Sequence, residues 1–99
     1  MVYPVIFATG AKNELQDSYY WYEEQQKGLG ERFLLIIERA VSLLAKFPFA
    51  FPEKIKTYRE YSINKFPYVM IYEVDNEHNT VYILHIFNTY QNEEKKLRE

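Results

Sequence analysis

The sequence predicts an α+β domain in which an N-terminal strand and a helical hairpin precede a three-stranded antiparallel meander, with both helices packed on one face of the sheet. This is the β-α-α-β-β-β order. Apolar residues recur at helical spacing between residues 11 and 47, and they alternate in three segments after residue 57. The 99 residues suffice for a single domain, 1–99, with one helical layer. The other face of the sheet is therefore expected to lack a cover.

A strand and a helix are expected at the start of the chain. Residues 2–8 are short, apolar and rich in β-forming types, and Pro4 fits the start of a strand or an edge strand. From residue 11 to near residue 27 the period becomes helical. The residues that share one side of this helix are Leu15, Tyr19, Tyr22 and Gln26. Gly28 suits the left-handed residue that follows a helix end.

A second helix is expected from residue 30 to residue 47. Glu31 places an acid in its first turn, and Pro48 ends it. A broad apolar stripe runs along this helix at Phe33, Ile36, Ile37, Ala40, Val41, Leu44 and Phe47. Because only residues 28–30 join the two helices, they must fold back as an antiparallel hairpin.

Three strands are expected in the second half of the chain. Residues 48–57, which include Pro48 and Pro52, are expected to form a loop. The strands expected after this loop are 58–63, 66–74 and 80–87, with a polar turn at 75–79. The first strand is expected to join this meander at an edge or beside the last strand. The charged residues 92–99 are expected to be a solvated tail.

Composition and charge exclude several classes of function. No cysteine is present, which excludes disulfides, a thiol nucleophile and zinc–thiolate sites. Twelve Lys and Arg against fourteen Asp and Glu give a net charge of −2, unlike a general nucleic-acid binder. The first residues do not resemble a signal peptide, and no apolar run approaches the ~20 residues that cross a membrane. We expect a cytoplasmic protein with no membrane contact, no cofactor and no metal.

Aromatic residues make up 18% of the chain, with ten Tyr, seven Phe and one Trp. Residues 64–74 are apolar on both faces of a strand, so the uncovered face is expected to be a docking surface or an oligomer interface. The expected partner contacts are Tyr61, Tyr68, Tyr72 and Tyr82 on that face and Trp21 on the first helix. The alternative is that the four hydroxyls lie in water without a partner. In the run YYWY, Tyr19 and Tyr22 are expected in the core, with Tyr20 and Trp21 on the flanks.

The two histidines do not indicate a catalytic or metal site. His85 has a free pKa that suits a general base. It alternates in step with Val81, Ile83 and Phe87, however. We therefore expect an ordinary strand histidine whose hydrogen bonds are satisfied and whose side chain lies on the same face as theirs. His78 is expected to be an exposed turn residue, with no second histidine to support a metal site.

Basic residues cluster only before the central strand, at Lys54, Lys56, Arg59 and Lys65. This cluster is the only candidate anion-binding patch, and Glu53 and Glu60 interrupt it. A solvated loop and strand edge is an equal alternative. No glycine-rich phosphate loop and no serine-nucleophile motif is present.

Several short motifs carry a family resemblance. In chain order they are GLGERF at 28–33, FP at 47–48, Arg59, FPYVMIYEV at 66–74 and ILHIFNT at 83–89. Together they resemble the RelE/ParE toxin superfamily, and most closely its ParE-like, plasmid-stabilisation branch. The resemblance spans nearly the whole chain and implies two N-terminal helices on an antiparallel sheet. It also implies a hetero-oligomer with a cognate antitoxin, whose disordered C-terminal segment folds onto the toxin.

The resemblance implies one of two activities. RelE-like members cleave mRNA on the ribosome with several Lys and Arg on the sheet, aided by a C-terminal Tyr or Arg. ParE-like members lack that set and poison DNA gyrase. The activity therefore depends on whether this chain has the basic residues.

This chain departs from the RNase pattern at several positions. Glu60, Ser62 and Val69 stand where the RNase branch carries basic residues. The family's C-terminal His, Arg and Pro correspond to Asn88, Gln91 and Glu93. The remaining catalytic candidates are Arg59, Lys65 and, as proton donor, Tyr90. We therefore expect a ParE-like toxin that acts by protein binding; the alternatives are a RelE-type ribosome-dependent mRNA endoribonuclease and an attenuated or non-toxic binding module with the same fold.

Overall fold

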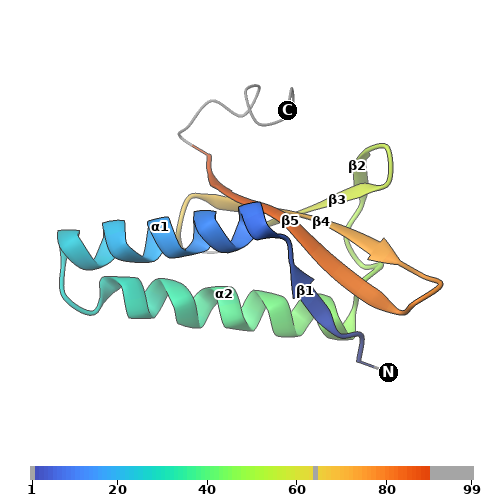
Figure 1. The fold of residues 1–99 in the computed structure, drawn as a ribbon, viewed down its shortest axis with the longest axis horizontal. Coiled ribbons are helices and arrows are strands. Elements are labelled where there is room, and N and C mark those ends of the chain that lie inside the picture. Colours follow the sequence, from blue (N-terminus) through green and yellow to red (C-terminus); the bar gives the residue numbers. More distant parts are fainter. Residues whose placement is uncertain (1, 64, 90–99) are drawn as a thin grey trace.

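The computed structural model describes residues 2–63 and 65–89. The elements in chain order are β1 (Val5–Phe7), α1 (Thr9–Gln25), α2 (Leu29–Lys46), β2 (Glu53–Ile55), β3 (Tyr58–Ser62), β4 (Tyr68–Asp75) and β5 (Thr80–Asn88). The two helices lie side by side against one face of a five-stranded sheet, which confirms the predicted α+β class (Figure 1). The expected tail, the catalytic candidate Tyr90 and the family-motif positions Gln91 and Glu93 lie outside the described residues.

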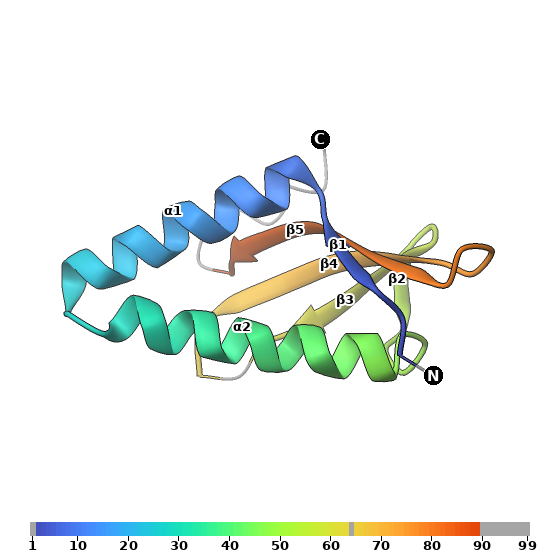
Figure 2. The same ribbon diagram turned by 60° about the horizontal axis from the view of Figure 1, so that its bottom comes forward.

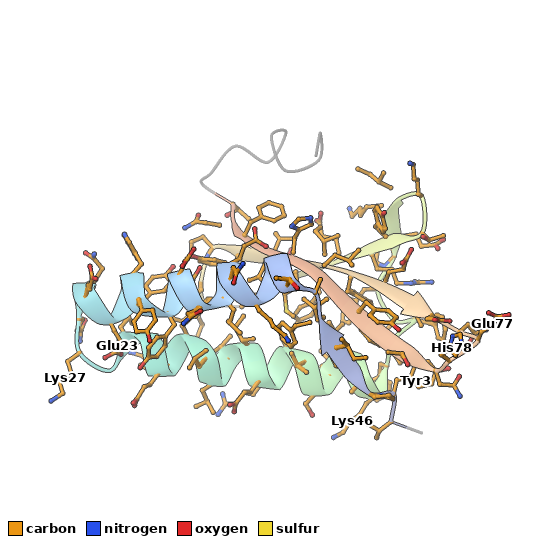
Figure 3. All side chains as sticks on the ribbon, viewed as in Figure 1. Tyr3, Glu23, Lys27, Lys46, Glu77 and His78 are labelled. Carbon is orange, nitrogen blue, oxygen red and sulfur yellow. The ribbon has the colours of Figure 1, made fainter. Side chains whose placement is uncertain are left out.

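Glycine and a carboxylate shape the turn of the helical hairpin. Gly28 has a φ of +89°, the left-handed conformation that was predicted for it. Gly30 is buried where a Cβ would lie 2.6 Å from the carbonyl oxygen of Tyr19, so only glycine lets the helices approach this closely. The Glu23 carboxylate of α1 accepts hydrogen bonds from the backbone N–H groups of Gly30 (2.8 Å) and Glu31 (3.3 Å). Glu23 lies at this end of the molecule (Figure 3). Its carboxylate therefore provides the acceptor for two backbone N–H groups in the first turn of α2, which have no partner within the helix.

The sheet has the strand order β1-β5-β4-β3-β2. β1 pairs in parallel with β5, with Ile6 beside Tyr82, and the remaining neighbours are antiparallel. Figure 2 shows β1 running from the end of α2 to the start of α1. The first strand therefore forms one edge of the sheet and lies beside the last strand, as expected.

β2 corrects the expectation of a loop at 48–57. Glu53 and Ile55 pair with Arg59 and Tyr58 of β3, and Lys56 and Thr57 form the tight turn between the two strands. All three residues of β2 are exposed, so they lack the apolar alternation that marks a half-buried strand in a sequence. β2 forms the second edge of a sheet with five strands rather than four.

The main core lies between the helices and the sheet. The rings of Tyr22 and Phe33 from the helices pack against those of Phe66 and Tyr68, with ring centroids 4.9 to 6.1 Å apart. Further buried members of this core are Ile37, Leu44, Met70, Tyr72, Val81, Ile83 and Ile86. Burial of each such large side chain contributes roughly 1.5–3 kcal/mol, so this layer is the main source of stability. The predicted burial of Tyr22 is confirmed.

A β-bulge in β5 changes which of its residues face the helices. Ile71 pairs with His85, while the next residue, Tyr72, pairs with Ile83, which leaves Leu84 as the extra residue. The odd-numbered residues of β5 therefore face the helices before the bulge and the opposite side after it. The expectation that His85 shares a face with Ile83 is wrong for this reason.

The C-terminal end of α2 also differs from the prediction. Phe47 has φ −132° and ψ 62°, so it leaves the helix and its side chain is exposed rather than part of the apolar stripe. The helix stops there because Pro48 follows, and a residue before proline is biased away from helical geometry. Neither α2 nor any other helix within residues 2–63 and 65–89 is long and apolar enough to cross a membrane.

Candidate partner-binding site

The open face of the sheet, the face opposite the helices, carries a small apolar cluster. It consists of Val69, Ile71 and Phe87, which are buried and separate from the main core. Glu60 and Ser62 of β3 pair with Ile71 and Val69 and lie on the same face. Over the described residues, the open face is therefore a small cluster beside an acidic side chain and not the broad aromatic surface that was expected.

Tyr68 and Tyr72 do not lie on the open face, and the expectation that they meet a partner there is wrong. Both side chains are buried in the main core. The Tyr68 hydroxyl donates to Ser18 Oγ at 2.9 Å, and the Tyr72 hydroxyl donates to the carbonyl of Pro48 at 3.1 Å. Burial raises the pKa of Tyr72 to about 12, although the positive charge of Arg59 acts in the other direction. A tyrosine can be buried when its hydroxyl finds such a partner, which apolar alternation does not reveal.

The other three residues that were expected to contact a partner lie on different surfaces of the molecule. Tyr61 packs against the main core on the helix side, where its ring meets Phe51 edge-on at 4.8 Å, so its placement on the open face is also wrong. Tyr82 pairs with Glu73 and lies half-buried on the open face. Trp21 is 55% exposed on α1, as expected. Partner contact by Tyr82 and Trp21 stays a prediction.

The structure does not bring Arg59 and Lys65 together. Arg59 Nη1 donates to the carbonyl of Phe51 at 2.6 Å, and its guanidinium lies over the ring of Phe49, 5.3 Å from the centroid. These contacts hold the loop after α2 against β3, which gives Arg59 a structural role. Lys65 follows the opposite end of β3, and Tyr90 lies outside the described residues.

A polar hollow of about 190 Å³ lies beside Asn88, where the family resemblance implies a histidine. Glu14 and Asp17 of α1 line it. Glu14 Oε1 accepts a hydrogen bond from the backbone N–H of Ile86 at 3.0 Å and lies 3.4 Å from His85 Nδ1. Two carboxylates repel phosphate, so this hollow is poorly suited to an RNA backbone.

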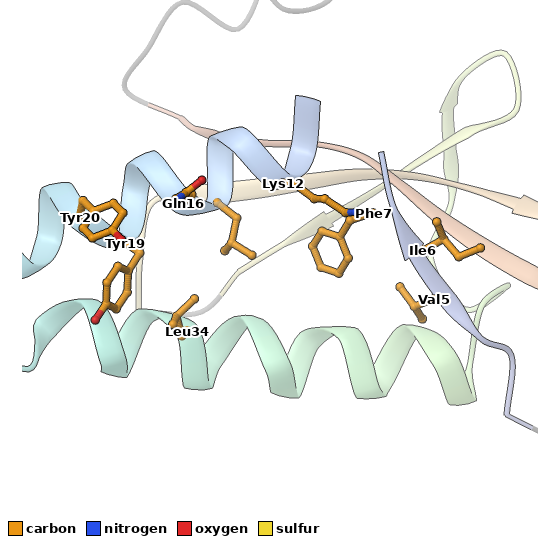
Figure 4. Close-up of a pocket in the computed structure, with 9 residues that line it drawn as sticks. Val5, Ile6, Phe7, Lys12, Gln16, Tyr19, Tyr20 and Leu34 are labelled. Atoms are coloured by element: carbon orange, nitrogen blue, oxygen red, sulfur yellow. The ribbon is translucent and has the colours of Figure 1, made fainter. Parts of the chain in front are cut away.

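An apolar groove of about 580 Å³ lies between the helices and β1 (Figure 4). Its lining residues are Val5, Ile6, Phe7, Lys12, Leu15, Gln16, Tyr19, Tyr20 and Leu34. Tyr20 is 56% exposed, so apolar surface faces solvent here. Ile6 is 49% exposed, but it pairs with Tyr82, so its side chain lies on the open face of the sheet. Sequence reasoning missed this groove because it is formed by three elements; the signal was the exposed position of Tyr20 on the flank of α1.

β1 adds an unpaired strand edge to the apolar groove. The carbonyl of Pro4 and the N–H of Ala8 bond to β5 at 2.9 and 2.8 Å. Because alternate peptides of a strand point to opposite sides, the N–H and C=O groups of Val5 and Phe7 point away from β5. No residue in the described part of the chain bonds to them. Such an edge can accept an additional strand.

The turn between β4 and β5 holds His78 beside Asp75, far from the hairpin turn of the helices (Figure 3). His78 Nδ1 lies 2.8 Å from Asp75 Oδ2, and Asp75 Oδ1 accepts from the backbone N–H groups of Glu77 and His78. The hydrogen bond from His78 holds the pKa of Asp75 below its usual value. His78 is exposed, as expected, and its contacts are those of a turn.

Fold and surface together define a small α+β domain in which an apolar groove beside the helical hairpin and β1 is exposed. The family model for the ParE toxin of type II toxin–antitoxin systems (parDE) matches residues 5–93. The chain belongs to this ParE toxin family, within the RelE/ParE superfamily that the motifs had indicated.

Solved structures show the same fold. The chromosomal ParDE toxin–antitoxin system from P. aeruginosa matches with a TM-score of 0.76 at 15% identity, over 88% of this chain and 96% of that one. The RelBE toxin–antitoxin complex from Mycobacterium tuberculosis gives 0.63 at 24% identity, over 89% and 92%. The intact E. coli RelBE complex gives 0.60 at 12% identity, over 87% and 95%. No curated protein sequence gives a significant match.

Proposed function

We propose that this chain is a ParE-like toxin that inhibits DNA gyrase by binding it, and that a cognate antitoxin neutralises it. Membership of the ParE toxin family over residues 5–93 supports the toxin role. The structures of similar fold from P. aeruginosa and Mycobacterium tuberculosis are toxin–antitoxin systems, which supports an antitoxin partner.

The distribution of charged side chains is the observation that favours protein binding over RNA cleavage. Cleavage of a phosphodiester needs cations placed on the phosphate and a group that transfers a proton. Here Arg59 bonds to the loop carbonyl of Phe51, and Glu60 lies on the open face. The hollow beside Asn88 carries carboxylates. These features favour a toxin that binds a protein target.

The apolar groove is our proposed docking place for the antitoxin. A disordered segment that folds on binding needs apolar surface to offset its loss of entropy, and this groove offers the exposed ring of Tyr20 and the half-buried side chains of Val5 and Phe7. The peptides of Val5 and Phe7 can bond to an extended segment laid along β1. The antitoxin would thus cover the side of the hairpin, with both backbone and side-chain contacts.

Induction of the chain without its antitoxin tests the activity. We expect arrested growth, and we expect the purified chain to inhibit supercoiling by gyrase in a plasmid assay on agarose gels. Mapped mRNA ends from the same cultures test the alternative. Cuts in ribosome-bound message that vanish in Tyr90→Phe would establish a RelE-type endoribonuclease instead. Normal growth together with tight antitoxin binding would establish an attenuated binding module.

A substitution in the apolar groove tests the docking place. Tyr20→Asp puts a charge on a groove side chain that is 56% exposed, so the fold tolerates it while antitoxin affinity falls by about 100-fold. Ile55→Asp is the matched control, because Ile55 is 40% exposed on β2 and does not line the groove. Titration calorimetry measures affinity. Equal affinity for the groove variant and the control would place the antitoxin elsewhere.

A further inference from the structure

A second groove, of about 330 Å³, lies between α2 and β3. Its apolar lining consists of Ile36, Ala40, Leu43 and Ile63. Arg39, Lys65 and Tyr61 line it as well, and we call it the Arg39–Lys65 groove. Ile36 is about 200° around the helix from Leu34, which lines the apolar groove, so the two grooves lie on opposite flanks of α2.

The polar groups of the Arg39–Lys65 groove have no partner among the residues that the structure describes. Neither the Arg39 guanidinium nor the Lys65 ammonium forms an ion pair or hydrogen bond with any residue of 2–63 or 65–89, and the same holds for the Tyr61 hydroxyl. No carboxylate lines the groove. Arg59 shows the contrast, because the Phe51 carbonyl and the Phe49 ring already engage it. Three hydrogen-bond donors therefore face the same space without an acceptor.

The lining indicates what kind of ligand would fit. Two cations and a hydroxyl favour an anionic group, while four aliphatic side chains favour an apolar one beside it. A nucleic-acid backbone would gain from the cations but not from the aliphatic lining, and the chain carries a net charge of −2. A peptide segment with a carboxylate side chain next to an apolar one satisfies both parts of the groove.

We propose that the Arg39–Lys65 groove binds an acidic, apolar segment of the antitoxin and places one of its carboxylates between Arg39 and Lys65. This inference rests on the proposed function, since it names a second contact of the same partner. Arg39 can hold a carboxylate in bidentate fashion, and Lys65 and Tyr61 can donate from the side of β3. A partner that occupies both grooves would pass around α2.

Calorimetric titration with the antitoxin encoded beside this chain tests the proposal. In the double variant Arg39→Ala, Lys65→Ala we expect affinity to fall about ten-fold at low salt and less at high salt, because screening weakens the contact in the wild type. The matched control is Lys27→Ala, Arg32→Ala, which removes the same charge from exposed positions that line neither groove. The control should change affinity by less than about two-fold.

Charge exchange makes the test specific. Arg39→Glu should let the toxin escape neutralisation by the antitoxin, so growth stays arrested. Replacing the contacting acidic residue of the antitoxin with Arg should restore neutralisation of this variant. If the wild type arrests growth and binds the antitoxin, but the double variant binds equally well, the acidic contact is overturned and the proposed function stands. If the wild type neither arrests growth nor binds the antitoxin, both fail. Loss of RNA binding in the double variant, with antitoxin binding unchanged, would also overturn the proposal.

Discussion

The helix side of the sheet and its open face bury apolar side chains on very different scales. The helix side joins Tyr22 and Phe33 of the helices to buried residues of β4 and β5 in one large core. The open face has a cluster of only Val69, Ile71 and Phe87. Stability therefore depends mainly on the helix side. Tyr20 and Trp21 of α1 and Leu35 of α2 are exposed, so we look for recognition on the helical hairpin rather than on the open face.

Matched isoleucine substitutions on the two faces give the largest expected effect. Ile83→Ala removes a fully buried side chain from the large core and should lower the free energy of unfolding by about 3–5 kcal/mol. Ile71→Ala removes the same atoms from the open-face cluster and should cost less than about 2.5 kcal/mol, because fewer neighbours lose contacts there. Urea denaturation followed by circular dichroism measures both. Equal losses would show that the open face contributes to stability as strongly as the helix side.

The sequence predicted the elements but not the side that each residue faces. Helical spacing identified α2 and the hairpin, because Gly28 and Pro48 mark its turn and its end. The bulge at Leu84 could not be predicted, because one inserted residue leaves the composition of the strand unchanged and reverses its alternation. β2 was missed because its exposed residues have no apolar pattern.

The candidate site was harder to predict than the fold. Tyr68 was expected on the open face, and the hydroxyl of Ser18, fifty residues away in the chain, is what permits its burial. Arg59 was expected as a catalytic candidate, and the carbonyl of Phe51 engages it instead. Contacts of this kind depend on tertiary packing. The apolar groove likewise exists only where β1 and both helices meet.

Tyr72→Phe tests the buried hydroxyl of the helix side and should have a smaller effect than the core truncation. The variant keeps the ring in the core and loses only the hydrogen bond to the Pro48 carbonyl, so the free energy of unfolding should fall by about 1 kcal/mol at neutral pH. The control should also remove one tyrosine hydroxyl, but from an exposed side chain. Tyr58→Phe is such a control, because that side chain is 39% exposed and should change stability by less than about 0.5 kcal/mol. A loss as small as that of the control would mean that the bond to Pro48 contributes nothing.

Alkaline pH sharpens the same comparison. Burial raises the pKa of both Tyr22 and Tyr72 to about 12, above the ordinary value near 10. Folding therefore favours the neutral phenols, and this contribution to stability is complete below pH ~10 and is lost as the pH rises towards 12. In Tyr72→Phe the decline in unfolding free energy should be shallower, as urea titrations across this range would measure. An identical decline in the variant would show that Tyr72 does not titrate with unfolding.

The turn at the end of the β4–β5 hairpin should give the smallest effect, because its groups lie in solvent. The hydrogen bond from His78 to Asp75 holds the pKa of Asp75 below its usual value. The contribution of Asp75 to stability is therefore present above the ordinary carboxyl pKa and is lost as the pH falls through the lowered one. His78→Ala should raise the pKa of Asp75 towards the usual value, measured by carbon NMR of the carboxyl group, with little change in unfolding. An unchanged pKa would mean that the backbone N–H groups of Glu77 and of residue 78 hold the carboxylate by themselves, since they remain in the variant.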